Sequence, residues 1–347
     1  MNEQPQPEDG AEGPGSAAED VAGRPDSAAE DVAGRPDSAA EDVAGRPDSA
    51  AEDVAGDVPA GSEVELATVP AAGPLYRRAA IGLAPGLGPA RRAGRLPATE
   101  LLVRGVVVDR EHLAAYDRVC GFRLCDALPA TYPHVLAFPL ALHLMSAPEF
   151  PLPLVGLVHV ANRITTYRRM DAAEPLDLSV RAVDLRPHDR GRQFDVVCTA
   201  SSGGDVVWRG LSTYLRRERT AREGARRDPG ERPAPPAPTG LWRVPSRVGR
   251  DYARVSGDHN PIHTSRIAAR LFGFARPIAH GMWSKARCLA ALEGRLPDAY
   301  TVDVAFKAPL PLPGTVAFSA AEGWTFGLHD SSRDRPYLVG EATPATP

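Results

Sequence analysis

The chain has 347 residues, of which 43% are hydrophobic and 24% charged, with 35 prolines and 32 glycines. This length fits roughly two domains of about 150 residues each. No apolar run approaches the ~18 residues of a membrane-spanning helix, and the four cysteines lack the spacing and density of a disulfide framework. The N-terminus is acidic, unlike a secretory signal. We therefore expect a soluble cytoplasmic protein without membrane association.

Charge is distributed unevenly along the sequence. Residues 1–57 hold 16 acidic residues and three arginines, a net charge of −13, so the remainder carries +9 within an overall −4. A basic body suits a polyanionic ligand such as coenzyme A or nucleic acid, although an arginine-rich solvated surface explains the same balance. The best basic patch for nucleic acid, 217–227, lacks aromatic interleaving and any recognition motif. We predict no nucleic-acid partner.

An 11-residue unit, SAAEDVAGRPD, repeats three times over 16–48, and a truncated copy covers 49–56. Each unit offers one valine among small and acidic residues, and its proline and glycine interrupt helices. Such a segment buries too little apolar surface to offset its ordering entropy. We predict a disordered acidic tail over 1–61.

Two segments with a similar order of elements follow the tail. In the first, a β-rich run at 100–108 precedes a short helix capped by Asp109, an apolar stretch to Met145 and four strands. These strands are expected at 154–164, 176–185, 194–200 and 206–215, the last two joined by a Gly203-Gly204 hairpin. The second segment is expected to form helices at 248–255 and 279–292 and strands at 300–307, 315–321, 324–328 and 337–342.

The two segments also match residue by residue, which indicates two copies of one α+β unit. YDRVCG at 116–121 lies over YARVSG at 252–257, and VHVANR at 158–163 lies over VDVAFK at 302–307. The second copy carries eight extra residues between its first helix and its apolar helix.

Domain boundaries follow from the change in composition between the copies. A segment rich in arginine and proline at 219–238 is typical of a linker. We therefore predict an N-terminal unit at 62–218 and a C-terminal unit at 239–347, after the tail at 1–61.

The loop SGDHNPIH, at 256–263, is the sharpest chemical feature of the sequence. Its turn-forming residues can aim Asp258 and His263 at one point, where they hold and activate one water molecule. The alternative is an Asp/Asn-rich turn with an incidental histidine. A metal site with His259, His263 and His280 is disfavoured, because no ligand motif of the usual spacing is present. We predict no metal.

The sequence AHGMW, seventeen residues after His263, opens an apolar helix. Unpaired N–H groups at a helix start, and the missing side chain of Gly281, suit the oxygen of a thioester as it becomes an enolate. An ordinary buried helix start, with His280 as a cap or core residue, explains the same pattern. Neither a dinucleotide-binding nor a P-loop motif is present.

Together, YARVSGDHNPIH and RPIAHGMW resemble the signature of the MaoC-like, R-specific enoyl-CoA hydratases. The resemblance covers roughly 62–347 and is to double hot-dog members, in which each of two units wraps a central helix in a curved antiparallel sheet. It implies reversible hydration of trans-2-enoyl thioesters in fatty-acid metabolism. Coenzyme A or acyl carrier protein would be part of the substrate, with no other cofactor. The chain would be a monomer with pseudo-dimeric units or a homodimer.

The resemblance also implies roles for individual residues. Asp258 and His263 match the pair that activates water, and Asn260 matches the residue that fixes their loop. Gly281 matches the backbone donor to the thioester carbonyl oxygen, beside His280 as a supporting residue.

The first unit departs from the motif. It carries Phe122 and Ala127 opposite Asp258 and His263, so we expect it to be non-catalytic and to hold the acyl chain. Apolar residues of 136–145 either line an acyl tunnel or form ordinary core.

Two other functions stay open. A hot-dog thioesterase would use a lone carboxylate to direct water at the carbonyl and would release free thiol, although the intact Asp-x-Asn-Pro-x-His motif disfavours it. A non-catalytic module would bind acyl thioesters without turnover.

Overall fold

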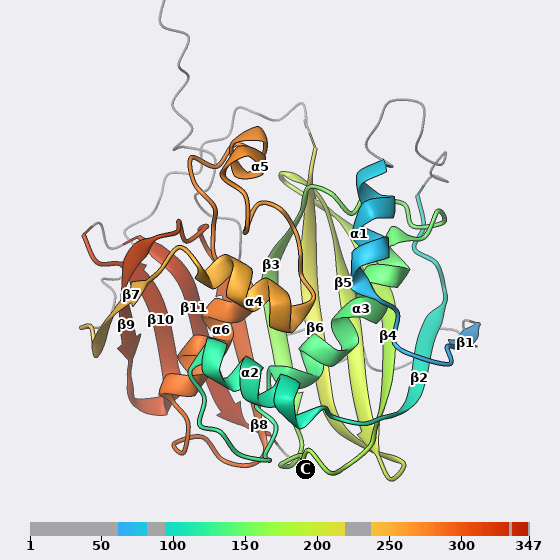
Figure 1. Ribbon diagram of the computed structural model, residues 1–347, viewed down its shortest axis with the longest axis horizontal. Helices are drawn as coiled ribbons and strands as arrows, with labels where there is room; N and C mark the ends of the chain where they lie inside the picture. Colours follow the sequence, from blue (N-terminus) through green and yellow to red (C-terminus); the bar gives the residue numbers. More distant parts are fainter. Residues whose placement is uncertain (1–61, 82–93, 219–236, 333–334, 346–347) are drawn as a thin grey trace, which may run out of the picture. The chain divides into compact units, whose positions relative to one another are not determined.

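The computed structural model describes residues 62–81, 94–218, 237–332 and 335–345 (Figure 1). The predicted tail over 1–61 and nearly all of the predicted linker lie outside these residues. The domain boundaries drawn from the sequence therefore stay a prediction.

The described chain forms eleven strands and six α-helices. In chain order, its first half contains β1 (Glu63–Glu65), α1 (Ala72–Ile81), β2 (Glu100–Val106), α2 (Arg110–Cys120), α3 (Tyr132–Ser146), β3 (Leu157–Thr166), β4 (Leu176–His188), β5 (Gly191–Ser202) and β6 (Asp205–Arg217). Its second half contains β7 (Gly240–Val244), α4 (Val248–Ser256), α5 (Arg266–Leu271), α6 (Gly281–Ala291), β8 (Tyr300–Phe306), β9 (Gly314–Ala320), a 3-10 turn (Glu322–Trp324), β10 (Thr325–Asp330) and β11 (Pro336–Pro344). Every helix and strand predicted from the sequence is present with shifted ends, whereas β1, α1, α3, β7 and α5 were not predicted.

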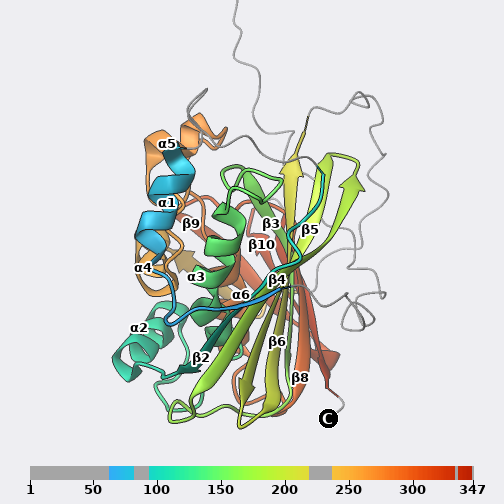
Figure 2. The ribbon, with the colours of Figure 1, turned by 90° about the vertical axis from the view of Figure 1, so that its right-hand side faces the viewer.

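The strands form one sheet in the order β1-β2-β4-β5-β6-β3-β8-β11-β10-β9-β7. Neighbours are antiparallel except for the β1–β2 pair at one edge. Helices cover one face of this sheet (Figure 2). Helix α3 packs on β4 and β5, α6 packs on β10 and β11, and α2 contacts both α4 and α6. This is the double hot-dog arrangement predicted above. Among the described residues, no helix combines the length and apolar character needed to cross a bilayer.

Residues matched by the internal repeat occupy equivalent places in the two halves. Gly121 ends α2 and Gly257 ends α4, with φ of 83° and 71°, a left-handed conformation that glycine adopts without steric cost. Tyr116 and Tyr252, on the same helices, meet with ring centroids 6.3 Å apart. The helices predicted to be copies of each other therefore pack together.

Lys285, a fully buried residue of α6, lies beneath the junction of β3 and β8. Its Nζ donates to the backbone carbonyl of Asn162 at 3.0 Å, to Asn162 Oδ1 at 2.6 Å and to the carbonyl of Val302 at 3.0 Å. Three acceptors match the three N–H groups of an ammonium, which offsets its loss of water. An ion pair between Arg163 and Asp303, at 2.7 Å, joins the same two strands.

We predict that Lys285→Met lowers the free energy of unfolding by roughly 2–4 kcal/mol, because three buried acceptors lose a donor while the amine's desolvation cost disappears. Chemical denaturation measures this change. Lys307→Met is the control, because Lys307 is partly exposed and its loss should shift the midpoint much less. Equal midpoints for wild type and Lys285→Met would contradict the role given to this amine.

Candidate functional site

A cavity of about 1240 Å³ is lined by both halves of the described chain. One wall comes from the loop after α4 and from the start of α6, and it contains Asp258, His263 and Gly281. The opposite wall comes from α3, β3 and β6. The predicted site residues therefore share one cavity.

The loop that carries Asp258 is shaped by its own side chains. Asp258 Oδ1 accepts from the N–H of Asn260 at 3.1 Å, and Asn260 Oδ1 accepts from the N–H of Ile262 at 3.3 Å. The carbonyl of Asn260 accepts from the N–H of His263 at 3.1 Å. Such side-chain turns reverse the chain over few residues, so Asn260 lies where a residue that fixes the loop is expected.

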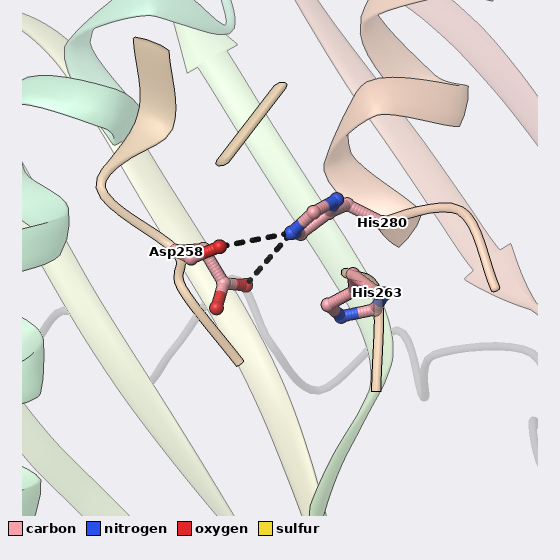
Figure 3. Close-up of side chains that lie close together, drawn as sticks. All are labelled: Asp258, His263 and His280. Atoms are coloured by element: carbon pink, nitrogen blue, oxygen red, sulfur yellow. Dashed lines mark hydrogen bonds and ion pairs between the residues drawn. The ribbon is translucent and has the colours of Figure 1, made fainter. Parts of the chain in front are cut away.

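Three side chains converge at the end of this loop, as Figure 3 shows for Asp258, His263 and His280. One polar atom of each lies within 4.8 Å of the others. The rings of His263 and His280 stack with centroids 3.7 Å apart. His280 Nε2 donates to the Asp258 carbonyl at 3.0 Å and lies 3.9 Å from Asp258 Oδ2. His280 thus holds the aspartate through its backbone carbonyl.

The tautomer of His263 follows from its hydrogen bond. Its Nδ1 lies 2.8 Å from the carbonyl of Ile278, which can only accept, so Nδ1 carries the proton and Nε2 keeps a lone pair in the neutral ring. Burial lowers the pKa of His263 against the opposing charge of Asp258. Burial, followed by His263, lowers the pKa of His280 to about 3. Both rings are neutral near pH 7.

Asp258 is charged under the same conditions. Burial raises its pKa, but His280, His263 and a hydrogen bond from Tyr76 outweigh that effect, so its pKa lies below the ordinary value. The site therefore combines a carboxylate with a neutral imidazole whose Nε2 can accept a proton.

Tyr76 is a site residue that the sequence reasoning missed. It lies on α1, and its hydroxyl donates to Asp258 Oδ1 at 2.5 Å, across 182 positions of the chain. Burial and the charge of Asp258 raise its pKa, so it stays a protonated donor. No motif surrounds Tyr76 in the sequence, and only the packing of α1 against α3 brings it to the cavity.

Gly281 is the first residue of α6, and it follows His280 in extended conformation. The N–H of a first helical residue has no acceptor within the helix. Space beside Gly281 is limited, because an added Cβ would lie 3.0 Å from Cε1 of Phe306. Glycine therefore keeps a backbone donor close to the cavity it lines.

The apolar stretch at 136–145 lies on helix α3, where some side chains line the cavity and others pack in the core. Phe138, Leu142 and Met145 line the cavity, at positions that share one helix face. Leu140 and Leu144 belong to the buried core, as does Met145, which also lines the cavity. The stretch 136–145 therefore contains both core and cavity-lining residues, and its role as an acyl tunnel stays a prediction.

Two histidines of the first half, His134 and His159, also line the cavity and were not predicted. Burial lowers the pKa of His134 to about 4 and that of His159 to about 3. Each lies between apolar residues in the sequence, so no local signal marks them. Phe122 and Ala127, placed by the repeat opposite Asp258 and His263, do not line the cavity.

Asp258, His263 and His280 also lie close enough together to surround a metal ion. His259, the other histidine considered as a ligand, faces Tyr76 instead, with ring centroids 6.4 Å apart. Two ring nitrogens, His263 Nδ1 and His280 Nε2, already donate to carbonyl oxygens. Chemistry without a metal stays a prediction.

Comparisons with known proteins identify relatives of this chain. The MaoC like domain family matches residues 243–328. The chain is 39% identical to 3-hydroxyacyl-thioester dehydratase X of Mycobacterium tuberculosis over 252 residues, covering 72% of this chain and 90% of that protein. A crystal structure of HtdX from Mycobacterium tuberculosis is similar with a TM-score of 0.64 and 36% identity, over 71% of this chain and 100% of that one. A MaoC-like dehydratase from Phytophthora capsici, 18% identical, has the same fold with a TM-score of 0.57, over 71% of this chain and 95% of its own.

We predict that Tyr76→Phe raises the pKa of Asp258, because the variant removes a hydrogen bond to the charged form of the carboxyl group. Carboxyl-carbon NMR titration measures this pKa. Tyr337→Phe is a matched control: it removes the hydroxyl that donates to Asp330 Oδ2 at 3.0 Å, so it should leave Asp258 unchanged. An unshifted Asp258 titration in Tyr76→Phe would mean that the hydroxyl does not support the carboxylate.

Proposed function

Because this chain belongs to the MaoC-like dehydratase family and is a hydro-lyase, we propose that it interconverts 3-hydroxyacyl thioesters and trans-2-enoyl thioesters. One observation carries the proposal. A carboxylate, a neutral imidazole and the backbone donor of a helix start line the same cavity, at Asp258, His263 and Gly281. Proton transfer and stabilisation of a developing oxyanion need these three kinds of group.

In the hydration direction, a water molecule would lie between Asp258 and His263. His263 Nε2 takes one proton from the water as the oxygen bonds to C3 of the enoyl group. The imidazolium then returns that proton to C2, so the elements of one water are added. Asp258 orients the water and stabilises the imidazolium. Dehydration follows the same steps in reverse.

Negative charge develops on the thioester carbonyl oxygen while C2 and C3 react. We assign the N–H of Gly281 as the donor to this oxygen, because the start of α6 adds the partial positive charge of its dipole. Asn260 holds the loop, and His280 holds Asp258 through its Nε2. Tyr76 keeps the carboxylate charged.

The cavity supports an acyl thioester as substrate. Its wall of Phe138, Leu142 and Met145 suits an acyl chain. Four basic side chains also line it and suit the anionic headgroup of a carrier, whether coenzyme A or acyl carrier protein: Arg217, Arg276, Lys307 and Arg335. We propose no further cofactor, a cytoplasmic location, and a chain whose paired units resemble a dimer.

We predict that Asp258→Asn and His263→Ala each lower kcat/KM for crotonyl-CoA by about 10²–10⁴-fold, the usual loss for a proton-transfer group. The assay follows absorbance of the conjugated enoyl thioester, together with a thiol reagent. His259→Ala, in the same loop but exposed, is the control and should retain most activity. Unchanged rates in either variant would refute the assignment, and release of thiol would indicate a thioesterase instead.

The pH dependence of kcat/KM provides a second test. His263 must be neutral to accept a proton, and burial keeps its pKa below the ordinary 6.5. The midpoint of the decline in kcat/KM at acid pH should therefore lie below pH 6.5, as His263 becomes protonated. A midpoint above pH 6.5 would show that a different group, or a His263 with a raised pKa, controls the reaction.

A further inference from the structure

Helix α5 presents apolar side chains to solvent beside the cavity. Ile267, Leu271 and Phe272 are 76%, 81% and 42% exposed, and they are three of the eight large hydrophobic side chains exposed among the described residues. Isolated exposed apolar residues are common, whereas three within six positions indicate a contact surface. The α5 surface is defined as Arg266, Ile267, Arg270 and Leu271.

The local structure of α5 explains this exposure. The hydroxyl of Ser265 accepts from the N–H of Ala268 at 3.3 Å and caps the helix, and Ala269 is fully buried. Residues four apart share a helix face. With Ala269 turned inward, the two arginines and the two apolar residues form neighbouring stripes on the outside. Both ribbon views place α5 at one end of the helical layer, away from the sheet (Figures 1 and 2).

The charge of this region has one sign. No Asp or Glu occurs between positions 259 and 292, although five basic residues do. Within the described part of the chain, neither Arg266 nor Arg270 has an ion-pair partner. The α5 surface therefore offers two uncompensated positive charges to a negative partner.

The α5 surface adjoins the cavity without being part of it. The residues directly after α5, from Phe272 to Arg276, line the cavity, but the four residues of the surface do not. A substrate held inside the cavity would leave Ile267 and Leu271 exposed. A partner that covers these two residues must extend beyond the cavity. Binding of coenzyme A alone does not require contact with them.

We propose that the α5 surface docks an acidic acyl carrier protein, whose pantetheine arm enters the cavity past Phe272. This inference rests on the proposed function, since it concerns how the thioester is delivered. Negative side chains of the carrier would face Arg266 and Arg270, while a small apolar contact covers Ile267 and Leu271. Complementary charge accelerates encounter, and the central apolar contact retains the partner.

The test compares one acyl group on three carriers, in the full chain. Rates are measured for trans-2-butenoyl groups on acyl carrier protein, on coenzyme A and on pantetheine. For the carrier-protein substrate, Arg266→Glu/Arg270→Glu should lower kcat/KM at least about tenfold, and the loss should shrink at high salt. Rates with coenzyme A and pantetheine should change less than about twofold, because the surface lies outside the cavity.

A matched variant controls for net charge. Arg118→Glu/Arg243→Glu reverses two exposed arginines on α2 and β7 and should leave all three rates unchanged. Ile267→Ser/Leu271→Ser keeps the charge and should also weaken use of the carrier protein alone. Equal losses for carrier protein and coenzyme A, or no loss for either, would overturn the proposal.

Direct binding separates this proposal from the proposed function. Affinity for acyl-loaded carrier protein is measured for wild type and for Arg266→Glu/Arg270→Glu. Selective loss of binding would support the docking surface even if no substrate turned over. Three results would overturn it: selective binding of a 1–57 peptide, selective binding of anionic vesicles, or self-association that the variant abolishes. Each would identify a different occupant of α5.

Discussion

The burial of one amine, Lys285, beneath the junction of β3 and β8 determines how the two halves of the protein meet. Removing an amine from water costs free energy unless each N–H group has an acceptor. Oxygens of Asn162 and Val302 supply three such acceptors. These oxygens lie on strands of different halves, while the amine lies on α6. A shift of α6 along either strand would break at least one bond. Gly281 lies about one turn before Lys285, so the same contacts hold the helix start at the cavity.

One cavity built by two copies explains why the copies have diverged. The second copy supplies Asp258 and His263, the proposed proton-transfer groups, from one wall. The first supplies the facing wall from α3, β3 and β6, and its own counterparts, Phe122 and Ala127, lie elsewhere. Under the proposed function, one pair of proton-transfer groups serves the cavity, so the first copy can provide apolar surface for the acyl chain. The eight extra residues of the second copy fall in the segment that contains α5.

The sequence predicted the features that depend on neighbours in the chain. Asp258 and His263 are brought together by a turn that local hydrogen bonds shape, and the helix start at Gly281 follows from its own apolar run. Two copies of one α+β unit were predicted from short sequence matches that occur in the same order in both, and the hot-dog fold was implied by the family resemblance. Tyr76 was not predictable, because 182 residues separate it from its carboxylate partner. His134 was missed for a related reason. It lies in an apolar helix, and the sequence alone does not distinguish a helix face that lines a cavity from one that packs in the core.

The protonation state of the site depends on this distant packing as much as on the loop. Burial pushes a carboxyl and an imidazole toward their neutral forms together, and a neutral acid beside a neutral base would not orient water or stabilise an imidazolium. Against burial, His280, His263 and then the hydrogen bond from Tyr76 lower the pKa of Asp258 and favour its charged form. The sequence also favours a charged Asp258, because no Asp or Glu lies between Asp258 and Glu293. That acid-free run leaves Asp258 without a like-charged neighbour in its own loop, and it also makes α5 positive at the cavity edge. One compositional feature thereby favours both a charged aspartate inside the cavity and an acidic partner outside it.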